Sequence, residues 1–333
     1  MKIAFFEVEK WEENFLKERL KNHTLYFSSK ELTPSRAKKI SSFDAIGVFI
    51  YSQVTSKVLD QLPKLKLITT LSTGFDHIDL EECKKRKIIV TNVPTYGENT
   101  VAEHTFALLL TLSRKILEAY NRTQRADFSA DGLKGFDLKD KTIGVIGCGH
   151  IGQHVVRIAN GFQMKVIVYE PHKDKILEKK LGFKYVSLDY LYKNSDIITF
   201  HVPLVESTKH MVNKGTLAKF KKGVILINTA RGGIIDTAAL ITGLSKGIIG
   251  GAGLDVLEGE CYIREEKQVI NKNFPKECNL KTILQNHVLI KEPNVLITPH
   301  CAFNSQEALE RILETTIKNI DGFSAKKKVN AVH

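Results

Sequence analysis

The sequence predicts an α/β protein in which two domains each contain a doubly wound parallel β-sheet, with a cleft between the domains. Two observations lead to this prediction. Short apolar runs alternate with helix-like segments along nearly the whole chain, which is the pattern of parallel strands joined by helical crossovers. The chain also has 333 residues, enough for two domains of ordinary size, each with its own core.

The first part of the chain, up to about residue 95, shows this alternation. Strands are expected at the apolar runs Lys2–Glu7, Thr24–Ser28, Ala45–Tyr51, Leu65–Leu71 and Lys87–Val93, with a helix at Trp11–Lys21. Two loops follow strands of this set, Tyr51–Gln53 and Ser72–His77. Ligands bind beyond the carboxyl ends of strands in such sheets, although each loop taken alone is more often an ordinary turn.

A long helix is expected next, from Glu98 to about Asn121. Its residues are apolar over most of the circumference, from Val101 to Leu112. A helix that is hydrophobic all round is buried, either between domains or against another subunit. This helix therefore marks a domain boundary, and it favours a homodimer.

A glycine-rich turn follows at Gly147, Gly149 and Gly152, between a buried strand ending near Ile146 and a helix over His150–Gly161. The first glycine permits a tight turn, the second lets a pyrophosphate approach the backbone, and the third lets the helix pack closely on the strand. The start of the helix offers N–H groups and a positive dipole end to phosphates. The pattern predicts a Rossmann-like dinucleotide site, the alternative being a parallel-sheet domain without a dinucleotide.

The next strand, Met164–Tyr169, ends at Glu170. An acid about twenty residues past the glycines is placed to bond the ribose hydroxyls of a dinucleotide. The same carboxylate would repel a 2′-phosphate, so NAD is favoured over NADP.

The alternation then continues to the end of the chain. Strands are expected at Asp196–Phe200, Gly223–Asn228, Gly250–Val256 and Asn294–Thr298. Helices are expected at Asp174–Leu181, after a cap at Ser187, from a cap at Asp236 to about Ser245, and from about Gln306 to Ile320. A polar stretch from residue 261 to about 281 interrupts the pattern.

Charged and imidazole side chains gather at the ends of these strands. The group comprises Arg231, Asp255, Glu260, His201 and His300, which share one edge of the predicted sheet with the glycine turn. Reduction of a keto acid beside a nicotinamide needs a cation for the carboxylate, an imidazole to donate a proton, and an acid to keep the imidazole protonated. The residue pattern does not choose between His201 and His300, and a lone histidine there is more often structural.

Composition narrows the class of partner. The formal net charge is +12, but the lysines are scattered along the length, with Lys326–Lys328 forming a run near the end, so we interpret the excess as solvated faces that also attract anionic small molecules. A polyanion partner is the alternative; neither nucleic acid nor membrane is expected.

Met1–Phe6 resembles a first strand rather than a signal peptide. Five cysteines without a C-x-x-C, and no HExxH, predict a cytoplasmic protein without disulfides or a metal site.

Six motifs, taken in order, resemble those of the D-isomer-specific 2-hydroxyacid dehydrogenases over nearly the whole chain. They are Val93–Tyr96, the turn at Gly147, Gly149 and Gly152, His201–Pro203, Asn228–Gly233, Leu254–Glu260 and Ile297–His300. The resemblance is strongest to the branch that reduces pyruvate to D-lactate. Where family members usually carry aspartate for the ribose, this chain has Glu170.

The resemblance implies a role for each matching residue. Arg231 would bind the substrate, His300 would donate the proton, and Glu260 would be its partner. The cofactor would contact Asp255 through its carboxamide and would be lined by His150, Ile151, His201, Val202, Pro203, Thr229 and Ala230. Thr73 and Gly74 would bind the substrate carboxylate, and Tyr51, Tyr96 and Phe303 would shape the side-chain pocket.

The resemblance also implies a discontinuous domain. Residues 1–98 and 302–333 would form the substrate domain, and residues 99–301 the NAD-binding domain, through which the homodimer would form. The expected activity is NADH-dependent reduction of pyruvate. The alternatives are a sibling enzyme for 2-ketoisocaproate, glyoxylate or hydroxypyruvate, and an NAD(H)-sensing protein like the transcriptional corepressors of this fold. The segment 261–292 receives no role.

Overall fold

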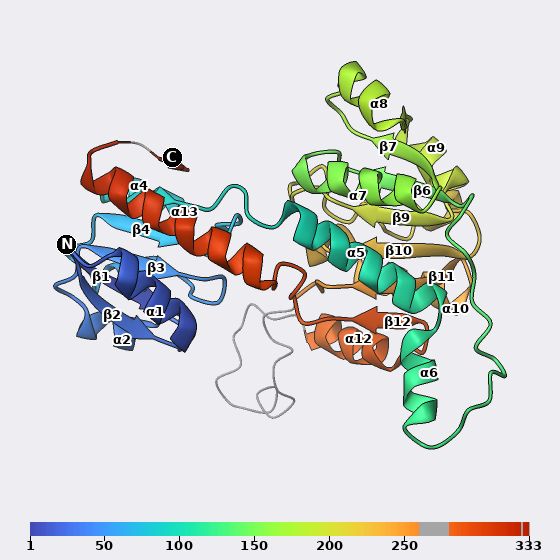
Figure 1. Cartoon of the computed structure of the whole chain (residues 1–333), viewed down its shortest axis with the longest axis horizontal. Coiled ribbons are helices and arrows are strands. Elements are labelled where there is room, and N and C mark those ends of the chain that lie inside the picture. The colour runs from blue at the N-terminus through green and yellow to red at the C-terminus, as the bar shows by residue number, and fades with distance from the viewer. Residues whose placement is uncertain (260–279, 328, 333) are drawn as a thin grey trace. The chain divides into compact units, whose positions relative to one another are not determined.

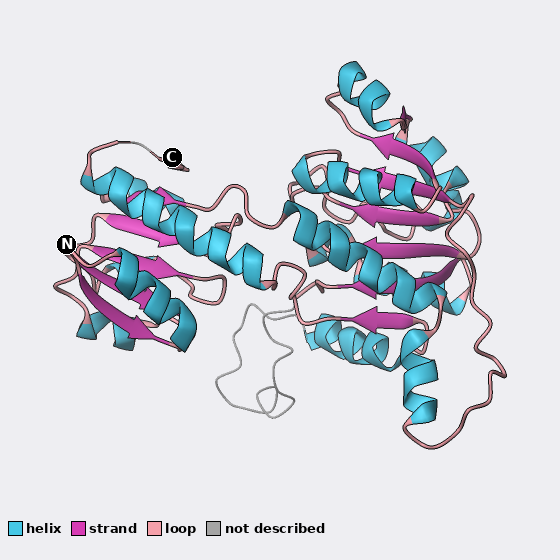
Figure 2. Ribbon diagram, in the orientation of Figure 1, coloured by secondary structure: helices cyan, strands magenta, loops and turns pink. Residues whose placement is uncertain are grey.

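The computed structural model describes residues 1–259, 280–327 and 329–332. It divides into two compact units, which Figures 1 and 2 show as ribbons. The first unit contains Met1–Tyr96 and Ser305–His333, and the second contains Gly97–Asn304. Glu260, the expected partner of the proton donor, lies outside the described residues, as do Cys261 and Cys278.

The first unit is built on a five-stranded parallel sheet in the order β2-β1-β3-β4-β5. The strands are β1 (Lys2–Phe6), β2 (Thr24–Ser28), β3 (Ala45–Val48), β4 (Leu67–Thr70) and β5 (Ile89–Thr91). The helices are α1 (Lys10–Arg19), α2 (Pro34–Lys39), α3 (Ser56–Leu59), α4 (Leu80–Lys85) and α13 (Gln306–Ser324). Every residue of β3 and β4 is buried, because helices cover both faces of the sheet.

The end of the chain returns to this first unit. Helix α13 packs on β4 and beside α1. After it, Ala331 forms an antiparallel bridge with Thr91 at the edge of β5. The unit is therefore assembled from both ends of the sequence.

The second unit contains a seven-stranded parallel sheet in the order β12-β11-β10-β9-β6-β7-β8. Its strands are β6 (Thr142–Ile146), β7 (Lys165–Tyr169), β8 (Lys184–Tyr185), β9 (Ile197–Phe200), β10 (Val224–Asn228), β11 (Ile249–Leu254) and β12 (Val295–Ile297). The direction of winding reverses between β6 and β9. Dinucleotides bind at such a switch point, beyond the carboxyl ends of the strands.

Helices cover both faces of the second sheet, over two separate apolar clusters. They are α5 (Glu98–Ser113), α6 (Ile116–Thr123), α7 (His150–Gly161), α8 (Lys175–Leu181), α9 (Leu188–Asn194), α10 (Thr237–Ser245) and α12 (Leu280–Lys291), with 3₁₀ turns η1 (Leu217–Lys219) and η2 (Gly232–Ile234). The expected caps are confirmed, because the side chain of Ser187 accepts from Tyr190 N and that of Asp236 from Ala238 N. The predicted two-sheet α/β architecture is confirmed. Helix α12 was not predicted.

The prediction of one helix over Glu98–Asn121 is wrong. The chain breaks after Ser113, and Lys115 takes up left-handed backbone angles with φ of +50°. The cause lies further along the chain, where Phe136 N donates to the carbonyl of Ser113 at 3.0 Å. The apolar helix α5 packs on α7 and β11 of its own unit, so its burial needs no second subunit.

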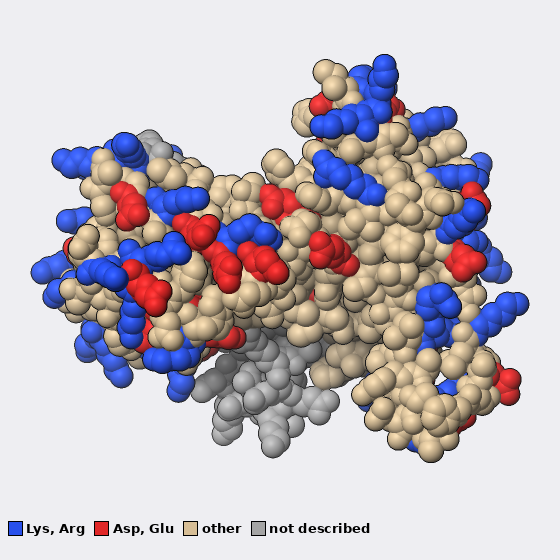
Figure 3. All heavy atoms as spheres, in the orientation of Figure 1, with Lys and Arg blue, Asp and Glu red and all other residues tan. Residues whose placement is uncertain are grey.

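The surface shows mixed charge. On the face drawn in Figure 3, Lys and Arg side chains are spread over both units, with Asp and Glu side chains among them rather than in one basic stripe. Within the described part of the chain, no helix combines the length and apolar character that crossing a bilayer requires.

Candidate active site

The glycine turn after β6 separates glycines that the protein's own packing requires from one that faces open space. Gly147 has φ of +92°, and a Cβ there would lie 2.4 Å from the carbonyl oxygen of His201. A Cβ on Gly152 would lie 2.1 Å from the carbonyl oxygen of Gly147. A Cβ on Gly149 would meet nothing within 4 Å. The backbone at Gly149 is therefore bare at the N-terminus of α7, which no side chain caps, and this fits the approach of a pyrophosphate.

Glu170 lies beside this turn, directly after β7. Its carboxylate accepts from Cys148 N at 3.0 Å and from His172 N at 3.3 Å. These bonds hold the half-buried side chain next to the glycines, at the position where a ribose would be bonded. The donors around the turn therefore fit a dinucleotide.

His201 follows β9, and its surroundings keep it neutral. Its Nε2 pairs with Thr199 Oγ1 at 2.9 Å, while its Nδ1 is buried without a hydrogen-bond partner among the described residues. Burial lowers the pKa of His201 to about 3. The imidazole is uncharged at neutral pH, and the single N–H of a neutral ring is a far weaker acid than an imidazolium, so this favours His300 as the proton donor. Val202 and the exposed Pro203 come next in the same loop.

The loop after β10 is organised by Asn228, which begins one of the predicted motifs but had no expected role. Its side-chain oxygen accepts from Ala230 N at 3.1 Å, and its amide donates to the carbonyl of Arg231 at 2.9 Å. Thr229 Oγ1 pairs with Thr105 Oγ1 of α5 at 3.0 Å. The side chain of Arg231, half-buried, donates to the carbonyl of Ala230 at 2.8 Å. The turn is thereby fixed where Arg231 leaves the sheet.

The loop after β12 wraps around Asp255, which follows β11. The buried carboxylate of Asp255 accepts from Thr298 Oγ1 at 2.5 Å, from Cys301 N at 2.9 Å and from Ala302 N at 2.8 Å. His300 N donates to the carbonyl of Asp255 at 2.9 Å, and His300 itself has φ of +52°. Asp255 therefore fixes the backbone that carries His300. Both of its carboxylate oxygens are already engaged in this loop.

The segment leading to Glu260 is also held from several sides. Glu258 Oε1 pairs with His210 Nε2 at 2.7 Å, and its Oε2 accepts from Thr237 Oγ1 at 3.1 Å. Asn286 of α12 donates to the carbonyl of Glu258 at 2.8 Å. A Cβ on Gly232 would lie 2.1 Å from the carbonyl of Leu257, so the loops after β10 and β11 are pressed together. His210 and Asn286 carried no signal along the chain, because their partners lie far away in sequence.

The expected substrate residues of the first unit all follow strands of its sheet. Tyr51 comes after β3, Thr73 and Gly74 after β4, and Tyr96 after β5. Thr73 Oγ1 donates to the carbonyl of Val93 at 2.8 Å, and Ser72 Oγ to that of Gly74 at 2.7 Å. Tyr51 N donates to the carboxylate of Glu7 at 3.0 Å. The remaining pocket residue, Phe303, belongs to the second unit.

Known proteins resemble this chain over its full length. Residues 106–302 match the model of the D-isomer specific 2-hydroxyacid dehydrogenase NAD-binding domain. A 2-hydroxyacid dehydrogenase homolog of Zymomonas mobilis is 37% identical over 99% of this chain and 98% of its own length. Glyoxylate reductase of Thermococcus litoralis is 37% identical over 86% of this chain and 82% of its own. The structure of Aquifex aeolicus D-lactate dehydrogenase, complexed with NAD and lactic acid, matches with a TM-score of 0.86 at 38% identity, covering 99% of this chain and 98% of that one.

Proposed function

We propose that this chain, which belongs to the D-isomer specific 2-hydroxyacid dehydrogenase family, reduces pyruvate to D-lactate with NADH. It is an NAD-dependent oxidoreductase of 2-hydroxyacids. The observation that carries the proposal is the arrangement of Arg231 and His300, on loops that follow β10 and β12, on either side of β11 in one sheet. A fixed cation and an imidazole at strand ends separated by a single strand suit a substrate with a carboxylate beside a carbonyl.

When bound, NADH would supply a hydride for the keto carbon of the substrate. Arg231 binds the substrate carboxylate through its forked guanidinium, and the turn held by Asn228 orients it. His300 donates a proton to the carbonyl oxygen as negative charge develops there. Glu260 keeps that imidazole protonated, and His201 lines the cofactor without transferring a proton. The family resemblance assigns Thr73 and Gly74 of the first unit to the same carboxylate.

Pyruvate is proposed over larger acids because the family resemblance assigns three large rings, those of Tyr51, Tyr96 and Phe303, to the side-chain pocket. One methylene in an apolar pocket changes the activation free energy by ~1–3 kcal/mol, so the ranking of substrates should be graded. The similarity to a D-lactate dehydrogenase supports the same choice. The similarity to a glyoxylate reductase keeps glyoxylate as the specific alternative.

The test follows NADH absorbance with pyruvate, glyoxylate, hydroxypyruvate, 2-ketoisocaproate and phenylpyruvate. We expect the highest kcat/KM with pyruvate, and oxidation of D-lactate but not L-lactate in the reverse direction. A clear preference for phenylpyruvate would show that the pocket assignment is wrong. NADH binding without turnover of any acid would instead support an NAD(H)-sensing protein.

We also propose a homodimer that forms through the second unit. The supporting observation is an apolar surface on α6 and the loop after it, where Ile116, Leu117, Tyr120 and Phe128 are exposed, Phe128 by 82%. Large apolar side chains exposed together on one short helix and the loop after it favour a protein–protein contact. Light scattering at micromolar concentration should give twice the chain mass, and Leu117→Glu with Tyr120→Glu should give the monomer mass.

The proposed location is the cytoplasm, supported by Cys83, Cys148 and Cys301, which are free thiols. Fractionation of cells that make the protein tests this assignment. Recovery of the protein from an oxidising compartment would contradict it.

A further inference from the structure

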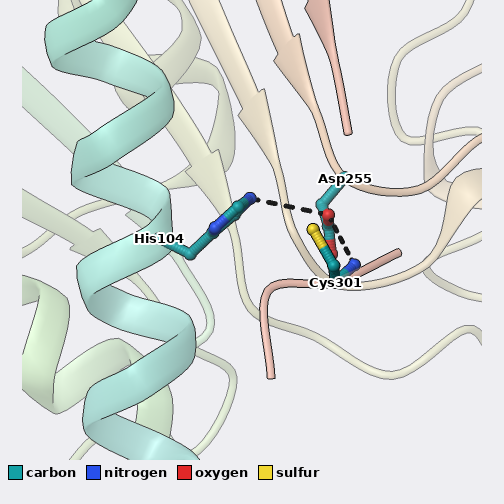
Figure 4. Close-up of side chains that lie close together, drawn as sticks. All are labelled: His104, Asp255 and Cys301. Carbon is teal, nitrogen blue, oxygen red and sulfur yellow. Dashed lines mark hydrogen bonds and ion pairs between the residues drawn. The ribbon is translucent and has the colours of Figure 1, made fainter. Parts of the chain in front are cut away.

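Three side chains with metal-binding atoms meet beside the loop that carries His300 (Figure 4). His104 reaches in from α5, Asp255 follows β11, and Cys301 follows β12. One ligand atom from each lies within 4.8 Å of the others, and His104 Nε2 is 3.5 Å from Asp255 Oδ1. Among the residues that the structure describes, this is the one group of His, Cys and acidic residues so arranged.

The chemistry of the three ligands selects a class of metal ion. An imidazole nitrogen, a carboxylate oxygen and a sulfur together suit Zn²⁺ and similar borderline ions, whereas Mg²⁺ and Ca²⁺ prefer oxygen alone. Zn²⁺ bonds of ~2.0–2.3 Å place tetrahedral ligand atoms roughly 3.3–3.8 Å apart, close to the separation of His104 and Asp255. Three protein ligands leave a fourth position for water, in contrast to structural zinc sites, which are closed by four protein ligands.

Access and existing bonds are compatible with an ion that enters from solution. Asp255 is buried, but His104 and Cys301 are each partly exposed. Thr298 Oγ1 now pairs with His104 Nε2 at 3.1 Å and donates to Asp255. A bound ion would take the place of that hydroxyl at His104, and the thiol of Cys301 would release its proton to solvent as the metal–sulfur bond forms.

We propose that His104, Asp255 and Cys301 form a binding site for a divalent ion of the zinc class, and that its occupancy reversibly inhibits the enzyme. The inhibition rests on the proposed function, because its target is the loop of the proton donor. His300 lies between Thr298 and Cys301 and bonds the backbone of Asp255. Drawing Asp255 and Cys301 onto one ion must shift this backbone, and therefore the imidazole.

Binding is tested with Co²⁺, which reports a thiolate ligand by a charge-transfer absorption band. The full-length protein, freed of metal with a chelator, is titrated with cobalt chloride. We expect the band to saturate at one ion per chain, to vanish in Cys301→Ser, and to persist in Cys83→Ser and in the Cys261→Ser/Cys278→Ser double variant. Loss of a residue that only orients a metal ligand lowers metal affinity ~10–100-fold. His104 is proposed as a ligand itself, so His104→Gln should lower the affinity for Co²⁺ at least ~100-fold. No band, or a band that survives Cys301→Ser, would overturn the site.

Inhibition is tested with Zn²⁺ on the same protein, with Mg²⁺ as the control ion. We expect Zn²⁺ to stop NADH-dependent turnover, EDTA to restore it, and Cys301→Ser to need about 100-fold more Zn²⁺ for half inhibition. If Co²⁺ gave the band but Zn²⁺ did not affect turnover, the proposed inhibition would be wrong and the proposed binding site would stand. A cobalt band in a protein that reduces no 2-ketoacid would overturn the proposed function and leave the site.

Discussion

The two sheets of this protein have the same kind of switch point, but a side chain crosses it in the first unit and glycines leave it open in the second. In the first unit, the winding reverses between β1 and β3, and Glu7, directly after β1, crosses that point. Its carboxylate accepts from Phe49 N at 3.2 Å, Tyr51 N at 3.0 Å and Ser52 N at 3.0 Å. In the second unit, the winding reverses between β6 and β9, and the turn after β6 carries no side chain at Gly147 and Gly149.

The difference shows that topology offers a ligand position and the residues of the first turn decide its use. Glu7 satisfies the backbone donors of the neighbouring loop with the protein's own carboxylate. At Gly149 the space beside the backbone stays open. A doubly wound sheet is therefore not by itself evidence of a dinucleotide site. A glycine at the switch point with open space beside its backbone is such evidence.

The largest expected effect tests whether the chemistry belongs to the second sheet. His300→Ala should lower kcat for pyruvate ~10²–10⁴-fold, the usual contribution of a positioned acid. His201→Ala should raise KM for NADH but leave the pH dependence of kcat in place, because burial holds the pKa of His201 at about 3. Steady-state kinetics from pH 5 to 9 measure both. If the pH dependence disappeared in His201→Ala and not in His300→Ala, the two roles would have to be exchanged.

The next largest effect distinguishes the glycine that leaves room for the cofactor from the glycine that close packing requires. Gly149→Ala should weaken NADH binding ~10–100-fold, since overfilling a site costs ~1–3 kcal/mol, and should leave Tm unchanged. Gly152→Ala should lower Tm, because its Cβ would meet a backbone oxygen at 2.1 Å. Gly161→Ala, which also faces open space but at the far end of α7, is the matched control for binding. Fluorescence titration and thermal unfolding distinguish the three. Unchanged NADH affinity in Gly149→Ala would refute the interpretation of the open turn.

The corresponding change in the first unit acts on stability. Glu7→Gln should destabilise the protein by ~1–3 kcal/mol at neutral pH, because an amide nitrogen replaces one accepting oxygen. Burial raises the pKa of Glu7, so the native state binds its proton more tightly than the unfolded chain. The wild type should therefore lose stability relative to Glu7→Gln as pH rises from 4.5 through the raised pKa. Urea unfolding across that range measures this difference, and parallel pH curves for the two proteins would contradict it.

The smallest expected effect concerns cofactor choice. Glu170→Gln keeps a side chain that can accept from Cys148 N but removes the charge. Two unit charges ~4 Å apart in water interact by ~1 kcal/mol, so the preference for NADH over NADPH should narrow roughly fivefold. Glu178→Gln, on α8, is the control acid. Comparable kcat/KM for NADH and NADPH in the unmodified protein would remove the role assigned to Glu170.

Local signals in the sequence determined much of this protein. The alternation of strands and helices, the position of helix α7 at His150–Gly161 and the caps at Ser187 and Asp236 were all predicted. Each depends on periodicity or on backbone groups satisfied within a few residues, so a short stretch of sequence carries the whole signal. The two parallel sheets follow from that alternation.

Tertiary structure decided the features that join distant residues. The helix breaks at Ser113 because Phe136 binds its carbonyl, and His201 is neutral because the fold buries it. His104, Asp255 and Cys301 show no metal-ligand spacing along the chain, yet α5 and the ends of β11 and β12 bring them within 4.8 Å. Such contacts join residues that are far apart in the sequence, so no local pattern of residues encodes them.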